Sequence, residues 1–403
     1  MSENSLQNKA RGEIQSEIHG TSQREFQGDF VGQKRREFLT NSTKFTAALG
    51  AVAAFPSLLN AANSSVNSNL NSAKNSANSN KNSQDFVNFA VNSATNSANS
   101  KANSSVISNK NSTSKGVKMQ TITLANGVKM PLVGFGTFQI TGEKCTECVK
   151  NALGVGYRLI DTAQAYYNEA QVGKAIAQSG VPRGEIFLTT KIWVSNHSAQ
   201  KARKSLLESL DRLQTPYIDL VLIHQPLSNY YAAYEAMEEL HKEGKIKSLG
   251  ISNFSSERMA DIATFCSVKP VVNQVETHLF FQQKAMREWL AKYKIAHQAW
   301  GPLSQHRISE VLKHPQVSKI AQKHGKSPAQ IALKFAVQQG ICVIPKTTSV
   351  ARMRENLALF DFALSDSELK TLGKIDENKS MWAAYDDPNI VQYAMSDDFE
   401  PSK

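Results

Sequence analysis

The sequence predicts an α/β fold, a (β/α)8 TIM barrel with an N-terminal β-hairpin lid, preceded by a disordered leader. From residue 121 onward, short apolar segments alternate with amphipathic helical stretches such as 198–213 and 230–242, a pattern typical of parallel α/β proteins. Three successive apolar segments also end in a side chain capable of acid–base chemistry. In a barrel the C-terminal ends of the strands meet on one face, where active sites are built.

Charge and composition exclude a nucleic-acid footprint. The 403-residue chain carries a net charge of +11, with 12 basic and 7 acidic residues in 1–117 and 34 and 28 in the remainder. No basic patch stands out, so no nucleic-acid partner is expected.

The first 62 residues are predicted to be a signal region. Arg35 and Arg36 precede a phenylalanine and a leucine, and 45–59 form an apolar run, which resembles a twin-arginine export signal. We therefore expect a periplasmic protein in transient contact with the export machinery. An Arg-Arg pair can also be plain surface charge, and the apolar run is short for a membrane span. Cytoplasmic location, or anchoring by an uncleaved signal, stays open.

Residues 63–115 are predicted to be a disordered linker. Asn and Ser fill 30 of these 53 positions, and such a composition cannot bury enough apolar surface to offset its conformational entropy. The barrel is then expected at 116–385, followed by a C-terminal tail at 386–403.

The four cysteines predict neither a redox pair nor a metal site. Cys145 and Cys148 have CxxC spacing, but no second such pair follows and the segment is helical in pattern. We interpret this pair as structural and expect no metal.

The segment GYRLIDTAQAYYNE (156–169) is the centre of the predicted site. A short apolar strand ends at Asp161, and Tyr166 follows five residues later, at the start of a predicted helix. A phenol ionises near pH 10, so it becomes a useful proton donor at neutral pH only if a cation stabilises the phenolate. Lys191, near the end of the next apolar segment (187–193), supplies that cation. His224 ends the third apolar segment (218–224).

With these residues the chain resembles the aldo-keto reductases over about residues 118–385. The motifs are GYRLIDTAQAYYNE, TTKIW, DLVLIHQP, GISNF, VNQVE and IPKTTSVARMREN. The resemblance places the family's catalytic tetrad on Asp161, Tyr166, Lys191 and His224. It implies NADPH-dependent reduction of aldehydes or ketones, with Tyr166 as the proton donor, and the chain is most similar to bacterial enzymes acting on 2,5-diketogluconate and methylglyoxal.

The resemblance also implies a cofactor site, and the chain has no GxGxxG motif for a Rossmann alternative. Three side chains would hold the nicotinamide carboxamide and an aromatic ring would stack on it: Ser252, Asn253, Gln274 and Trp300. Ser252 and Asn253 could instead cap the following helix. Gly301 follows Trp300 where the family often has serine, which leaves the phosphate contacts of this loop open.

The start of the last predicted helix is typical of a phosphate site, because free N–H groups and the helix dipole favour an anion. Lys346 and Arg352 match the family positions that bind the 2′-phosphate, so the resemblance implies NADPH. The remaining expected cofactor contacts are Gly136, Thr137, Thr347, Glu355 and Asn356.

Trp193 and Trp382 are the candidate substrate-pocket residues, and a monomer is expected. The alternative function is an NADPH-binding barrel that acts as a regulatory or scaffolding subunit. The complete tetrad argues against it, but fold and cofactor site alone do not establish turnover, so the alternative is kept.

Overall fold

The computed structural model describes residues 120–381 and 388–394. The predicted signal region, the linker and Trp382 lie outside these residues, as do parts of the C-terminal tail. Within the described residues, no helix is long and apolar enough to span a bilayer.

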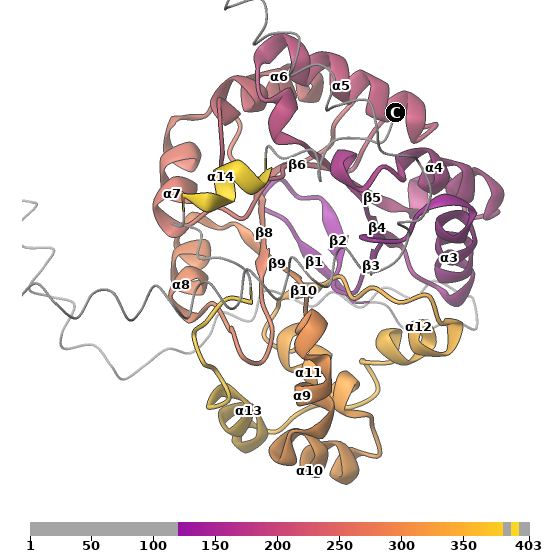
Figure 1. Cartoon of the computed structure of the whole chain (residues 1–403), viewed down its shortest axis with the longest axis vertical. Coiled ribbons are helices and arrows are strands. Elements are labelled where there is room, and N and C mark those ends of the chain that lie inside the picture. Colours follow the sequence, from indigo (N-terminus) through magenta and orange to yellow (C-terminus); the bar gives the residue numbers. More distant parts are fainter. Residues whose placement is uncertain (1–119, 382–387, 395–403) are drawn as a thin grey trace, which may run out of the picture. The chain divides into compact units, whose positions relative to one another are not determined.

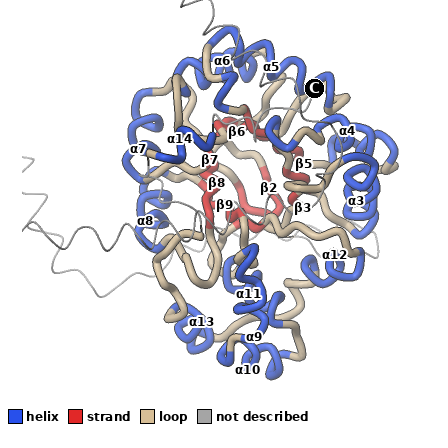
Figure 2. The backbone as a smooth tube through the Cα atoms, in the orientation of Figure 1, coloured by secondary structure: helices blue, strands red, loops and turns tan. Residues whose placement is uncertain are grey.

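Eight parallel strands form one sheet in the order β10-β9-β8-β7-β6-β5-β4-β3, and helices surround them (Figures 1 and 2). The strands are β3 (Phe135–Gly136), β4 (Leu159–Asp161), β5 (Phe187–Ile192), β6 (Leu220–Ile223), β7 (Leu249–Ser252), β8 (Val272–Glu276), β9 (Ala296–Trp300) and β10 (Cys342–Val343).

The sheet closes on itself beside its first and last strands. Val133 forms a parallel bridge with Val343, and the Gly134 N–H donates to the Val343 carbonyl at 2.8 Å. Gly136 is required here because a Cβ at this position would lie 2.8 Å from the Ile344 carbonyl oxygen. These contacts make the closed barrel that the sequence predicts.

Most helices lie between consecutive strands. Their bounds are α3 (Gly142–Val155), α4 (Glu169–Gln178), α5 (Ala199–Arg212), α6 (Tyr230–Lys242), α7 (Ser256–Phe265), α8 (Lys284–Tyr293), α9 (Ile308–Lys313), α10 (Pro315–His324), α11 (Pro328–Val337), α12 (Val350–Leu357), α13 (Asp366–Gly373) and α14 (Asn389–Ala394). The apolar faces of α3–α8, α11 and α12 pack on the outer side of the strands in one large core cluster, and α9, α10 and α13 pack with α11 in a second cluster. Cys145 and Cys148 are buried in the large cluster on α3, in the structural role expected of them.

The predicted hairpin is present. Strands β1 (Thr121–Thr123) and β2 (Lys129–Pro131) pair antiparallel, and Gly127 in the connecting turn has φ +85°, a conformation that favours glycine. Leu124 and Met130 pack against the inward-facing aliphatic side chains of the barrel strands. The hairpin therefore covers the end of the barrel opposite the strand C-termini.

Candidate active site

The C-terminal ends of β4 and β5 bring three predicted catalytic residues together. Lys191 Nζ lies 2.5 Å from Asp161 Oδ1 and 3.2 Å from Tyr166 Oη, and it also donates to the Thr162 carbonyl at 3.0 Å. Tyr166 lies in a 3-10 turn (Gln164–Tyr166) ahead of α4, so it precedes the helix that the sequence predicts there. The phenol thus has the neighbouring cation that proton donation requires.

His224 follows β6 on the same face of the barrel. Its ring centroid lies 5.7 Å from that of Tyr166 and 5.0 Å from that of Trp193, both edge to face. All four predicted catalytic side chains therefore converge on one place.

The protonation states suit an acid that donates to a carbonyl oxygen. Burial raises the pKa of the Tyr166 phenol, although the Lys191 ammonium opposes the rise. Burial disfavours the Lys191 charge, but the Asp161 carboxylate and the Tyr166 oxygen together, through their charges and hydrogen bonds, raise the pKa of Lys191. Burial, together with Lys191 and His197, holds the pKa of His224 well below its ordinary value. At neutral pH the site therefore has a protonated phenol, an ammonium and a neutral imidazole.

The predicted carboxamide-binding residues lie next to this cluster. Asn253 donates through Nδ2 to the His224 carbonyl at 3.0 Å and accepts from Trp300 Nε1 at 2.7 Å. Ser252 Oγ donates to the Gln274 carbonyl at 2.9 Å. The helix-cap alternative is wrong, because the N-cap residue of α7 is Ser255.

Gly136 and Thr137 lie beside Asp161, and the structure gives each an internal role. The neighbouring Ile344 carbonyl explains the glycine, and Thr137 is fully buried, with its hydroxyl donating to the Asp161 carbonyl at 2.9 Å. Their contact with a cofactor stays a prediction, and Thr137 is placed to support the Asp161 backbone.

The residues predicted to bind phosphate gather at the N-terminus of α12. Ser349 caps the helix by accepting from the Arg352 N–H at 3.4 Å, and Thr347 Oγ1 accepts from the Ser349 N–H. Of the remaining three predicted contacts, Lys346 is exposed and Asn356 is buried. Glu355 accepts a hydrogen bond from the Ser327 hydroxyl. The site offers two exposed cations at a helix N-terminus, which fits a nucleotide phosphate.

The predicted substrate side of the site is lined by aromatic rings. Trp193 is buried at the end of β5. Phe138, which the sequence reasoning missed, lies with its ring centroid 5.0 Å from that of Tyr166. The sequence signal that could have identified Phe138 is its position directly after the first predicted strand and next to Thr137.

A buried carboxylate that the sequence reasoning also missed attaches the C-terminal segment to the barrel. Glu276, at the end of β8, is fully buried and accepts from Ser380 Oγ at 2.5 Å and from the Met381 N–H at 2.8 Å. His278 Nε2 lies 2.9 Å from the same carboxylate. Since Trp382 comes next in the chain, Glu276 fixes where the predicted pocket loop begins.

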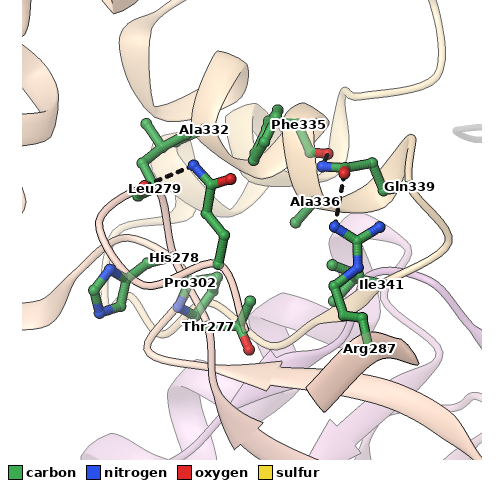
Figure 3. A pocket seen from close by; sticks show the side chains of 11 residues that line it. Thr277, His278, Leu279, Arg287, Pro302, Ala332, Phe335, Ala336, Gln339 and Ile341 are labelled. Carbon is green, nitrogen blue, oxygen red and sulfur yellow. Dashed lines mark hydrogen bonds between the residues drawn. The ribbon is translucent and has the colours of Figure 1, made fainter. Parts of the chain in front are cut away.

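A separate small cavity lies between α8 and α11 (Figure 3). Its volume is about 10 Å³, room for one water molecule. Arg287 and Gln339 meet at its edge, where the guanidinium donates to Gln339 Oε1 at 2.8 Å. None of the four predicted catalytic residues lines it, so it is not the active site.

The chain is similar in sequence and in fold to known members of one family. The Aldo/keto reductase family profile matches residues 132–377. The chain is 39% identical over 260 residues to the 9,11-endoperoxide prostaglandin H2 reductase of Trypanosoma cruzi, covering 64% of this chain and 92% of that one. It is 40% identical over 263 residues to the methylglyoxal reductase DkgA of Escherichia coli K12, covering 64% and 94%.

A solved structure agrees with these matches. The aldo-keto reductase MGS-M4, from a Medee basin deep-sea metagenome library, superposes with a TM-score of 0.65 at 37% identity, covering 66% of this chain and 98% of that one. The chain belongs to the aldo/keto reductase family and is an oxidoreductase that reduces carbonyl groups.

Proposed function

We propose that this enzyme reduces small aldehydes or ketones, dicarbonyls among them, with NADPH as the cofactor and Tyr166 as the proton donor. The observation that carries the proposal is the contact of Lys191 Nζ with both Asp161 Oδ1 and Tyr166 Oη, at 2.5 and 3.2 Å. This arrangement gives a phenol at neutral pH the cationic neighbour it needs to release a proton.

Each side chain has one role in this mechanism. When bound, the cofactor supplies the hydride from its nicotinamide ring. Tyr166 gives its proton to the carbonyl oxygen, and Lys191 stabilises the phenolate that remains. Asp161 keeps Lys191 charged and oriented. The neutral His224 imidazole has one N–H with which to position the substrate oxygen.

The preference for NADPH over NADH is supported by the two exposed cations beside α12. Neither Lys346 nor Arg352 forms an ion pair with an acidic side chain within 120–381 and 388–394. Their charges therefore remain available to a 2′-phosphate at a helix N-terminus.

Small dicarbonyl substrates are supported by the relatives. One is named as a methylglyoxal reductase and is 40% identical to this chain. The aromatic rings of Phe138 and Trp193 near Tyr166 suit an uncharged carbonyl carbon chain. 2,5-Diketogluconate is the second candidate substrate.

The deciding experiment compares the full-length chain with Tyr166→Phe. NADPH consumption is followed with methylglyoxal, 2,5-diketogluconate and an aromatic aldehyde, and NADPH binding is measured by quenching of tryptophan fluorescence. We expect the variant to lose at least about a hundredfold in turnover, because general acid catalysis contributes about that much or more, and to bind NADPH as the native chain does.

Tyr157→Phe is the matched control. Tyr157 is a fully buried phenol that donates to the Met353 carbonyl at 3.0 Å, outside the tetrad. Native turnover in Tyr166→Phe would refute Tyr166 as the donor. NADPH binding without turnover of any carbonyl by the native chain would favour the regulatory alternative.

We further propose that residues 1–62 direct twin-arginine export, that the mature enzyme acts in the periplasm and that it is monomeric. The support for export is the sequence Lys34-Arg35-Arg36-Glu37-Phe38-Leu39 ahead of an apolar run, a pattern typical of export signals. Cell fractionation of the native chain and of Arg35→Lys/Arg36→Lys tests it. Equal periplasmic amounts of the two would refute this route.

A further inference from the structure

A chain of buried hydrogen bonds crosses the barrel interior behind Asp161. Gln274 Nε2 donates both to Asp161 Oδ2 at 2.8 Å and to Gln298 Oε1 at 2.7 Å. Gln298, on β9, has no exposed surface and Gln274 has 1%. Each carboxylate oxygen of Asp161 thus has a donor, Lys191 on one side and Gln274 on the other.

The charge of Asp161 fixes the direction of every bond in this chain. An ionised carboxylate only accepts, so Gln274 must present its amide nitrogen to it. The same nitrogen meets Gln298, which must therefore present its oxygen. The Gln298 nitrogen then faces two sulfur atoms, Cys342 Sγ at 3.3 Å and Met130 Sδ at 3.8 Å.

The far end of the chain is also consistent with this direction. Cys342 Sγ donates to the Pro131 carbonyl at 3.2 Å. Complete burial raises the pKa of the Cys342 thiol to about 12, so it keeps the proton that it donates. Every hydrogen bond from the hairpin strand β2 to the catalytic carboxylate therefore pairs one donor with one acceptor.

Burying the Gln298 amide costs free energy of folding unless its polar atoms form good hydrogen bonds. Its register neighbours on the adjacent strands are Gln274 on β8 and Cys342 on β10, and a buried amide needs hydrogen-bond partners. On its nitrogen side it has only thioether and thiol sulfur, which are weak acceptors. Its one strong hydrogen bond is the one that it accepts from Gln274.

We propose that Gln298 is a positioning residue for carbonyl reduction, acting through Gln274 on both Asp161 and the nicotinamide carboxamide. Both hydrogens of Gln274 Nε2 are engaged, which leaves Oε1 as the atom that can meet a ligand. That oxygen would accept a hydrogen bond from the carboxamide N–H of a bound cofactor. This inference rests on the proposed function.

The consequence is that Gln298 couples cofactor binding to proton donation. Without it the Gln274 amide loses the partner that holds its nitrogen toward Asp161. The titratable and charged groups that then face the altered site are Asp161, Lys191, Tyr166, His224 and Cys342.

The test uses two substitutions in the full-length chain, Gln298→Met and Gln298→Glu. Methionine fills the space but offers Gln274 only a thioether sulfur, which is a weak acceptor, so we expect the Kd for NADPH to rise and kcat to fall by about three- to tenfold, the worth of one hydrogen bond. Glutamate still accepts from Gln274, so we expect Kd within about twofold of native. Its added negative charge disfavours the Tyr166 phenolate and moves the alkaline limb of the kcat profile to higher pH.

Gln282→Met is the matched control, because Gln282 is an equally buried glutamine outside the chain of bonds, donating to the Leu279 and Leu372 carbonyls. It should lose stability but keep native Kd, kcat and pH profile.

A folded Gln298→Met enzyme with native Kd and kcat would overturn the inference. If that variant does not fold, Gln298→Glu decides alone, and an unshifted alkaline limb overturns it. Failure of the proposed function looks different, since the native chain itself would then not reduce carbonyls or Tyr166→Phe would remain active.

Discussion

Lys191 Nζ lies 2.5 Å from Asp161 Oδ1, and the two side chains are 0% and 2% exposed. A buried ion pair of this kind contributes little net stability against an apolar pair, but removing one partner leaves a buried charge without compensation. The pair therefore sets the charge distribution of the site. Replacing either partner alone should lower the free energy of unfolding strongly.

Asp161→Asn should lower the free energy of unfolding by about 3 kcal/mol or more, the cost of an uncompensated buried ammonium. An asparagine would also turn an N–H toward either Lys191 or Gln274. The double variant Asp161→Asn/Lys191→Met should recover most of the stability and none of the activity. Urea unfolding of the three proteins checks this. A single variant as stable as the native chain would contradict the tight coupling of the pair.

The pH dependence of the free energy of unfolding should show the lowered pKa of His297. Burial, and next Arg287, lower the pKa of this histidine from 6.5 to about 3. Between those values the unfolded chain binds a proton that the folded chain does not, so stability is lost as pH falls through that window. From pH 7 to 5 the contribution is about 2 kcal/mol.

The measurement is urea unfolding at both pH values for native chain and His297→Gln. The variant should lose about 2 kcal/mol less than the native chain on acidification. His306→Gln, at an exposed histidine, is the control and should follow the native chain. Equal acid sensitivity of His297→Gln and the native chain would refute the assignment.

The barrel and the tetrad could be predicted from sequence because their signals are local. Strands β4, β5 and β6 are largely apolar and fully buried, and Asp161, Lys191 and His224 lie at or next to their C-terminal ends. The contact of Gln274 with Asp161 joins residues 113 positions apart, and no local pattern predicts which polar group an amide will face. The link from Glu276 to the C-terminal segment escaped notice for the same reason, since Ser380 and Met381 lie more than 100 residues later.

Cofactor preference should depend on the two cations at α12. Lys346→Ala and Arg352→Ala should each raise the KM for NADPH about tenfold, the worth of one charge-assisted hydrogen bond, and leave the KM for NADH unchanged. Arg354→Ala is the matched control, because Arg354 is an exposed cation on the same helix outside the positions that the resemblance assigns to phosphate. Equal losses for both cofactors would show that these cations do not select the 2′-phosphate.

The attachment of the C-terminal segment should weaken in Ser380→Ala. The Ser380 hydroxyl donates to the buried Glu276 carboxylate, and the Met381 N–H bonds to the same group. Hydrogen bonds to a charged group are worth about 1.5 kcal/mol or more, so amide exchange at Met381 should quicken about tenfold. Hydrogen exchange of the C-terminal peptides measures this, with Ser367→Ala, at an exposed serine on α13, as control. Because Trp382 follows directly, the KM for the carbonyl substrate should rise as well. Unchanged exchange at Met381 would show that the backbone bond alone holds the segment in place.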